Sequence, residues 1–338
     1  MNLPLSQLLR QPRQSLARYL VIFALILIAL LVLVPLPSQA QDSTITFAVI
    51  GDYGRNNTPA LNVANMVASW NPDFVLTTGD NYYTGAGGSG TGTYDQSTGK
   101  FYCRFLKDAA PGDSCGASGM DPVTNRFFPS LGNHDYSDTG GVSVYLSYFT
   151  LPGIGFSNSS GNERYYDFVW GPVHFFAINS NSADPDGNSS TSAQAGWLHD
   201  RLAASTAPWQ VVYLHHPPYS SANGGSFMTL QWPFADWGAD VVLAGHNHVY
   251  ERIVREGIVY FVDGTGGKGL SGFGTTWVTG SEFRYSANYG AMRITASSTA
   301  LDFEFLSIDN GGTLQDSYHL QGSAPLLFHH FYPLVSNP

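Results

Sequence analysis

The sequence predicts an α/β fold, and three observations support this prediction. The segments TITFAVIGDYG and DFVLTTGDNYY are apolar strands on either side of a helical segment, and such a strand–helix–strand unit normally forms a parallel pair. Further short apolar runs rich in β-branched residues recur along the chain without helical spacing. No internal repeat or linker divides the chain after residue 40, so one large domain is expected over residues 41–320.

The first 40 residues differ from the rest and predict a secretory signal peptide. Residues 1–18 carry three arginines and no acidic residue, and residues 19–34 are apolar without interruption. Small Ser38 and Ala40 fit the −3 and −1 positions of a cleavage site after Ala40. An uncleaved membrane anchor is the alternative, although the apolar run is shorter than the roughly 20 residues that a comfortable span needs. Either way we expect export, to the medium, the periplasm or the cell surface, with membrane contact only if the leader is uncleaved.

Charge and cysteine content narrow the possible functions. Removal of residues 1–40 leaves 12 basic residues against 25 acidic ones, a net charge of −13. Nucleic-acid binding is therefore not expected, because it needs a basic patch. The two cysteines, Cys103 and Cys115, are close in sequence, and we expect them to form one disulfide in an oxidising compartment.

The remaining elements follow in chain order. Thr58 is a plausible N-cap with Pro59 at the first helical position, and apolar residues at helical spacing predict a helix to residue 70. Residues 84–121 are rich in Gly, Ser and Thr and are expected to form a long loop or small insertion at the rim of a site. The patterns then predict a strand in 126–136 and two strands in 165–180 with a turn at Gly171-Pro172. A helix is expected in 190–205, capped near Ser190 or Thr191. The remaining elements are strands in 209–219 and 239–252, a strand pair in 253–264 and a closing hairpin in 289–309.

Five of the predicted strands end in polar side chains that can bind metal ions. These are Asp52, Asp80 with Tyr83, Asn133 with His134, His215, and His246 with His248. Ligands bind beyond the carboxyl ends of strands in α/β sheets, so these groups are expected to meet at one rim. Each cluster taken alone is also typical of residues that cap a helix or form a turn. Five such clusters in this order are not expected from caps and turns alone. Seven donors suit two metal ions that share a carboxylate.

The spacing of the last two histidines supports this interpretation. Side chains two residues apart on an extended chain point the same way. His246 and His248 can therefore converge on one centre, while Asn247 points away. By the same alternation His216, next to His215, is expected to point elsewhere.

The ordered motifs GDYG, GDNYY, GNHD, VYLH and GHNHVYER resemble those of the calcineurin-like metallophosphoesterases. Tyr83, three residues after Asp80, makes the chain look more narrowly like the purple acid phosphatase branch. The resemblance spans roughly Phe47 to Asp309. It implies a two-sheet β-sandwich flanked by helices, with α-β-β-α layers, in a small single-domain form followed by a tail at 321–338.

The resemblance also implies roles for individual residues. Asp52, Tyr83 and His248 would bind the first metal, Asp80 would bridge both metals, and Asn133, His215 and His246 would bind the second. Ferric iron is expected at the Tyr83 site, and zinc, manganese or ferrous iron at the other. His134 would be the general acid that protonates the leaving group; orienting Asn133 is its alternative role.

The predicted function is that of an exported phosphomonoesterase for small phosphorylated substrates. Two metal ions can neutralise phosphoryl oxygens and lower the pKa of a bound water that attacks phosphorus in line. A phosphodiesterase acting on cyclic nucleotides or similar esters and a non-catalytic surface protein on the same scaffold are the alternatives. One position departs from the family pattern: Gly224 stands nine residues after His215, where a second substrate-side histidine is usual.

Overall fold

The computed structural model describes residues 44–89, 92–107 and 123–322. These belong to one folded unit, Ser43–Pro338. The predicted leader, Cys115 and tail residues 323–338 lie outside the described residues, so cleavage, the disulfide and the role of the tail stay predictions. In the described part of the chain, none of the helices is both long and apolar enough to cross a membrane.

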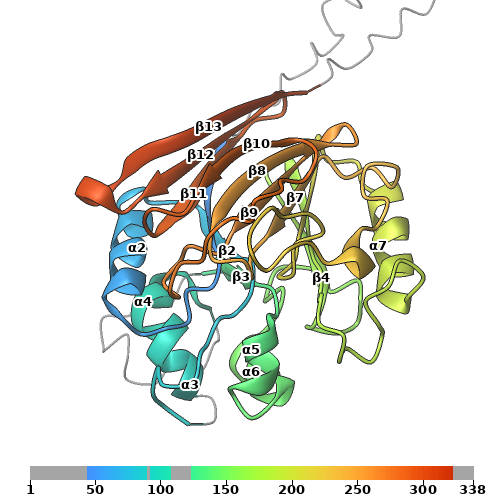
Figure 1. Ribbon diagram of the computed structural model, residues 1–338. Helices are drawn as coiled ribbons and strands as arrows, with labels where there is room; N and C mark the ends of the chain where they lie inside the picture. Colours follow the sequence, from blue (N-terminus) through green and yellow to red (C-terminus); the bar gives the residue numbers. More distant parts are fainter. Residues whose placement is uncertain (1–43, 90–91, 108–122, 323–338) are drawn as a thin grey trace, which may run out of the picture. The chain divides into compact units, whose positions relative to one another are not determined.

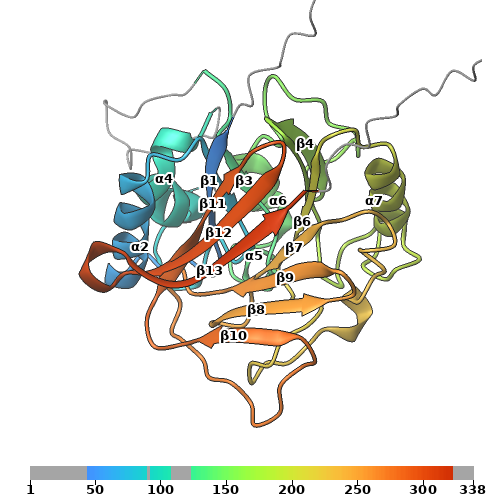
Figure 2. The same ribbon diagram turned by 90° about the horizontal axis from the view of Figure 1, so that it is seen from above.

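Two mixed β-sheets form the centre of the fold (Figures 1 and 2). The first has the strand order β13-β12-β11-β1-β2-β3. Its strands are β1 (Ile45–Ile50), β2 (Phe74–Thr77), β3 (Phe127–Pro129), β11 (Gly290–Ala296), β12 (Ala300–Ser307) and β13 (Thr313–Gln321). The second has the order β10-β8-β9-β7-β6-β5-β4. Its strands are β4 (Tyr166–Trp170), β5 (Val173–Ala177), β6 (Trp209–Tyr213), β7 (Val241–Ala244), β8 (Tyr250–Arg255), β9 (Ile258–Asp263) and β10 (Ser281–Tyr285).

Aromatic and aliphatic side chains from the two sheets pack against each other in a common core. Phe74 of β2 and Phe175 of β5 meet with ring centroids 5.3 Å apart, and Phe47 of β1 lies 5.1 Å from both. Along β6, Val211 faces this core, whereas Val212 belongs to a second apolar cluster on the other face of the sheet. That alternation is the period of two expected of a strand buried on both faces.

Helices cover the outer faces of the sheets. The helix α2 (Thr58–Ser69) buries its apolar stripe, including Val63 and Val67. The helix α7 (Ala193–Ala203) buries Leu198 and Leu202 in the cluster behind the second sheet. Figures 1 and 2 show these two helices on opposite sides of the sheets. The predicted two-sheet sandwich flanked by helices is therefore confirmed.

The helix starts differ slightly from the predicted ones. The N-cap of α2 is Asn57, whose Oδ1 accepts a hydrogen bond from the Ala60 amide at 3.0 Å. The N-cap of α7 is Ser192, which accepts from the Ala195 amide at 3.2 Å. The predicted caps, at Thr58 and at Ser190 or Thr191, were wrong by one or two residues. Each helix follows a run of adjacent Asn, Ser or Thr residues, and all of these side chains can cap.

Helical turns also occupy the segment that was predicted as a loop. The described part of this segment contains α3 (Gly92–Tyr94), a π-helical turn (Asp95–Gly99), α4 (Lys100–Tyr102) and a 3-10 turn (Cys103–Phe105). Ser97 donates a hydrogen bond to the carbonyl of Asn81 at 2.7 Å, and Thr98 lies 2.7 Å from the hydroxyl of Tyr53. The insertion thus packs behind the two loops that follow β1 and β2.

Four short helical segments complete the described chain: α5 (Asn133–Ser137), α6 (Val142–Tyr148) and 3-10 turns at Met228–Leu230 and Asp309–Gly311. The closing hairpin of β11 and β12 agrees with the prediction, and β13 pairs antiparallel with β12.

Candidate metal centre

The five predicted clusters meet where β1, β2 and β3 of one sheet and β6 and β7 of the other come to an end. Strands β1 and β2 run parallel, as do β2 and β3, and β6 and β7, so within each sheet the polar residues follow at one edge. Asp52, Asp80 and His246 have positive φ values of 56°, 53° and 68°. Left-handed backbone at non-glycine residues is costly and clusters at functional sites.

The backbone at His246 corrects the argument from strand alternation. Strand β7 ends at Ala244, and the Asn247 and Val249 amides each bond to the carbonyl two residues earlier, at 2.8 and 2.7 Å. His246 and His248 therefore reach the same centre through a tight turn and not along an extended strand. Asn247 does point away: its amide nitrogen donates to the carbonyl of Gly225 at 3.0 Å.

Two acceptor atoms and a ring nitrogen of His246 face one another in the predicted second metal site. His215 Nδ1 lies 2.8 Å from the carbonyl oxygen of Thr78, so this nitrogen carries the proton of the neutral ring. Its Nε2 therefore presents a lone pair, yet it lies 3.0 Å from another acceptor, Oδ1 of Asn133. His246 Nδ1 lies 3.0 Å from the same oxygen and 3.2 Å from His215 Nε2. Burial lowers the pKa of His215 to about 3, so a proton does not resolve this arrangement.

In the predicted first metal site His248 instead pairs with Asp52: burial lowers the pKa of His248, but its contacts with Asp52 outweigh burial and raise that pKa. His248 Nδ1 lies 2.7 Å from the carbonyl oxygen of Gly269, while its Nε2 faces Oδ1 of Asp52 at 3.3 Å. Tyr83 donates its hydroxyl to the same Asp52 oxygen at 2.8 Å. Burial raises the pKa of Asp52, but the bond to His248 and the nearby histidine charges outweigh it and hold that pKa well below its usual range.

Asp80 lies between the two groups of donors. Its Oδ1 accepts a hydrogen bond from the His134 amide at 2.9 Å and lies 3.4 Å from His215 Nε2. Burial, together with the charges of Asp52 and Asp135, raises the pKa of Asp80 well above its usual range. Gly132 makes this approach possible, because a Cβ there would lie 2.2 Å from Asp80 Oδ1 and 2.3 Å from the Asp80 amide.

These observations fit a centre for bound cations. The lone pairs of His215 Nε2 and Asn133 Oδ1 point at each other, and the buried carboxyl groups of Asp52 and Asp80 have no described Lys or Arg paired with them. A cation among these donors would separate the two lone pairs and balance the charge of the carboxylates. Asp52, Asp80 and His215 also offer donor atoms that all lie within 4.8 Å of one another.

His134 lies at the edge of this centre, half-buried, with its ring centroid 4.4 Å from that of Tyr83. Its Nδ1 lies 2.9 Å from Oδ2 of Asp138, which leaves Nε2 for another partner. Asp138 also accepts from the amide of Thr84, and such contacts lower its pKa to about 2 in spite of partial burial. Asp138 was not predicted from the sequence, although its spacing of four residues from His134 across α5 was a usable signal.

Lys268 and His216 were also missed. The Lys268 ammonium lies 4.3 Å from the ring centroid of Tyr83, and its amide donates to the carbonyl of Asp52 at 2.9 Å. His216 does not point away as predicted: its ring centroid is 4.5 Å from that of His246, and its ring forms a close group with His215 and His246. The cause is that β6 ends at Tyr213, so strand alternation no longer applies at His216.

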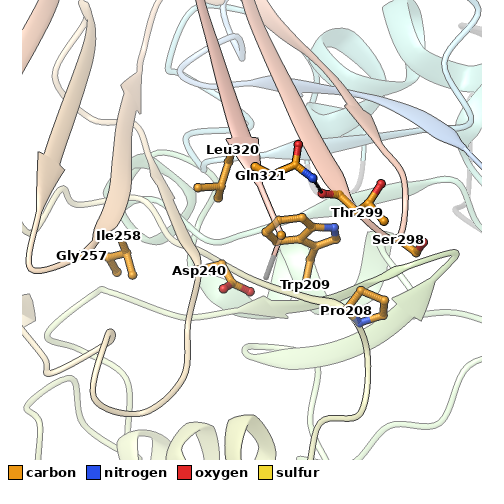
Figure 3. Close-up of a pocket in the computed structure, with 10 residues that line it drawn as sticks. Pro208, Trp209, Asp240, Gly257, Ile258, Ser298, Thr299, Leu320 and Gln321 are labelled. Carbon is orange, nitrogen blue, oxygen red and sulfur yellow. Dashed lines mark hydrogen bonds between the residues drawn. The ribbon is translucent and has the colours of Figure 1, made fainter. Parts of the chain in front are cut away.

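Two cavities differ in their relation to these residues. One of about 400 Å³ is lined by Asn133 and His216, so it opens beside the predicted second metal site. Another of about 440 Å³ lies at the opposite ends of the strands, beside Trp209 at the start of β6 and Ile258 at the start of β9 (Figure 3). This second cavity contains none of the predicted site residues.

Comparison with known proteins agrees with this geometry. The calcineurin-like phosphoesterase family matches residues 45–250, and the family described as iron/zinc purple acid phosphatase-like protein C matches residues 257–317. Purple acid phosphatase 23 of Arabidopsis thaliana is 28% identical over 264 residues, which cover 69% of this chain and 54% of that protein. Phosphoenolpyruvate phosphatase of Allium cepa is 26% identical over 241 residues, which cover 66% of this chain and 45% of that protein.

The chain thus spans about half the length of these two curated relatives. Among solved structures, a purple acid phosphatase from yellow lupin (Lupinus luteus) seeds has a TM-score of 0.64 at 19% identity, covering 83% of this chain and 54% of that one, and shares the fold. The family match extends from β1 to the histidines that follow β7. The chain therefore belongs to the calcineurin-like phosphoesterase family, with a purple acid phosphatase-like C-terminal region.

Proposed function

We propose that this protein is a phosphomonoesterase that uses two metal ions. The observation that carries the proposal is the pair of facing acceptor atoms, His215 Nε2 and Asn133 Oδ1, next to the buried carboxyl groups of Asp52 and Asp80, with His134 at the edge. A phosphate ester bound there would have its leaving oxygen within reach of an imidazole, which is the side chain best suited to proton transfer near neutral pH.

The donor sets favour different ions. Asp52, Asp80 and Tyr83 supply three anionic oxygens beside His248, which suits ferric iron. Asn133, His215 and His246 are less anionic and suit zinc, manganese or ferrous iron. When bound, two such ions would neutralise phosphoryl oxygens and lower the pKa of a water molecule.

The other steps of the proposed mechanism belong to the protein's own side chains. Asp138 accepts a hydrogen bond from His134 Nδ1 and so orients the ring. His134 Nε2 is then free to give a proton to the leaving alkoxide. Lys268, beside Tyr83, adds a positive charge that attracts the phosphate dianion.

Metal analysis and kinetics on one preparation test this proposal. Purified without chelator, the protein should contain two metal ions and hydrolyse 4-nitrophenyl phosphate faster than bis(4-nitrophenyl) phosphate. Faster hydrolysis of the diester would favour the phosphodiesterase alternative. A metal-loaded protein that hydrolyses neither ester would favour the non-catalytic alternative.

Export and small phosphorylated substrates are part of the same proposal. The arginine-containing start, the apolar run and Ala40 support cleavage that leaves Gln41 as the first residue. N-terminal sequencing of the processed protein tests this directly. If membrane-bound protein still begins with Met1, residues 1–40 are a membrane anchor and not a cleaved signal peptide.

A further inference from the structure

The cavity of about 400 Å³ beside Asn133 has no role in the mechanism described so far. Because the Asn133 oxygen is shared with His215 and His246, a phosphoryl group held at the centre has this cavity next to it. The cavity is therefore placed to hold the part of a substrate that leaves as an alcohol.

Ser180 prepares His216 as a hydrogen-bond donor in this cavity. The Ser180 hydroxyl accepts from the His216 amide at 3.0 Å and lies 2.9 Å from His216 Nδ1, to which it can donate its own proton. Ser180 is 2% exposed and His216 8%, so water does not compete freely for these bonds. With Nδ1 accepting, the remaining ring nitrogen, Nε2, carries the proton and can donate to a ligand oxygen.

The rest of the lining is polar but uncharged. Asn181 uses its side-chain oxygen to accept from the Ala183 amide at 2.9 Å, which leaves its amide nitrogen for a ligand. Asn188 donates its amide nitrogen to the carbonyl of Ser180 at 2.9 Å, which leaves its oxygen as an acceptor. Thr229 adds a hydroxyl, and the ring of Phe227 lies 4.5 Å from that of His216. The residues that line this cavity include no Lys, Arg, Asp or Glu.

We propose that this cavity is the leaving-group subsite and that it selects phosphate monoesters of uncharged, hydroxyl-bearing alcohols, such as polyols and sugars. His216 and Asn181 donate to the alcohol hydroxyls, Asn188 accepts from them, and Phe227 covers the carbon skeleton. A second anionic group on the leaving alcohol finds no cation in the lining to balance it. This inference rests on the proposed phosphomonoesterase function.

Three esters of one chain length test the subsite in the metal-loaded protein. Glycerol 1-phosphate carries two hydroxyls, propyl phosphate carries none, and 3-phosphoglycerate carries one hydroxyl and a carboxylate. We expect kcat/KM for glycerol 1-phosphate to exceed that for propyl phosphate by about tenfold, or about 1.4 kcal/mol, which two net hydrogen bonds can supply. We expect 3-phosphoglycerate to be the poorest of the three.

Variants connect this preference to the cavity. Asn181→Ala and, separately, His216→Ala should reduce the preference for glycerol 1-phosphate to about twofold while both metals stay bound. Asn65→Ala, an exposed amide on α2, is the matched control and should leave the preference unchanged. Asn181→Ala keeps the test open if His216→Ala does not fold.

The outcomes separate the subsite from the proposed function. An active wild type that hydrolyses glycerol 1-phosphate and propyl phosphate equally would overturn the subsite and leave the phosphatase in place. Loss of a metal from His216→Ala would instead make His216 a ligand and overturn its assigned role. No hydrolysis of any of the three esters or of 4-nitrophenyl phosphate by metal-loaded protein would overturn the phosphatase function, and the subsite with it.

Discussion

His134 is held by a single carboxylate, and this contact makes its function testable. Because Asp138 fixes the ring through Nδ1, His134→Ala removes a proton donor without removing any of the seven predicted ligands. We expect kcat for an alkyl phosphate to fall by about 100-fold or more, the size typical of general acid catalysis, and kcat for 4-nitrophenyl phosphate to fall much less. Steady-state kinetics with both esters and metal analysis measure this. An equal fall on both esters, or loss of metal, would contradict the assignment.

Tyr83 gives a spectroscopic prediction. A phenolate bound to ferric iron absorbs visible light, whereas burial and the Asp52 charge raise the pKa of unbound Tyr83 above its usual range. We therefore expect the wild type to be coloured and Tyr83→Phe to be colourless, with the second metal still bound. An absorption spectrum and a metal count on both proteins test this. A colourless, iron-free and fully active wild type would argue against iron at this site.

The residues that could be identified from sequence are those carried by local motifs. Asp52, Asp80 and Asn133 lie two, three and four residues after the ends of β1, β2 and β3, so their place at the rim follows from the strand pattern. Lys268 could not be found this way, since only the packing of the chain after β9 brings it to Tyr83. The prediction for His216 was wrong because the alternation of side chains along β6 was assumed to continue past Tyr213, where this strand ends.

At the scale of the element, the loops that follow the strands decide the geometry of the candidate metal centre. The tight turn at His246 and the left-handed backbone at Asp52 and Asp80 occur at residues other than glycine. The conformational preferences of these residue types therefore do not predict them. Strand β10, whose side chains along SEFRY all stay at least partly exposed, carries too weak an apolar pattern to be predicted. The strand–helix–strand unit of β1, α2 and β2 was predictable because its apolar spacing is local and strong.

The loop after β3 provides a prediction at this scale. Gly132→Ala would place a methyl group 2.2 Å from Asp80 Oδ1, so Asp80 or the loop must move. We expect a loss of stability of about 2 kcal/mol or more, and weaker metal binding. Denaturant unfolding and metal titration measure both effects.

The matched control for this substitution is Gly196→Ala. A Cβ at this exposed position of α7 meets no described atom within 4 Å outside the helix. Alanine has the higher helix propensity, so this variant should be as stable as the wild type or more stable by up to about 1 kcal/mol. Similar losses in both variants would show that close packing around Asp80 is not what requires glycine at 132.

At the scale of the whole folded unit, the metal centre joins the two sheets. Asp52, Asp80 and Asn133 follow strands of the first sheet, while His215, His246 and His248 follow strands of the second. Elsewhere the sheets meet mainly through apolar side chains, together with polar contacts such as those of Tyr250 and Arg252 on β8 with Asp316 on β13. None of the donors of the candidate metal centre takes part in these two contacts. Without a cation, the rim holds buried carboxylates and facing lone pairs, so bound metal would stabilise the contact between the sheets as well as support catalysis.

Removal of the metals should therefore lower the stability of the folded unit as a whole. Metals that bind the folded state stabilise it by about 4 kcal/mol when their free concentration is about 1,000 times Kd. For a domain of this size that corresponds to a fall in Tm on the order of 10 °C after treatment with a chelator. Calorimetry before chelation, after it and after re-addition of zinc or iron measures the change, which should be reversible. Because the donors come from both sheets, Asp52→Asn and His215→Ala should each reduce the metal-dependent part of Tm. An unchanged Tm after complete removal of metal would show that apolar packing alone holds the sheets together at this rim.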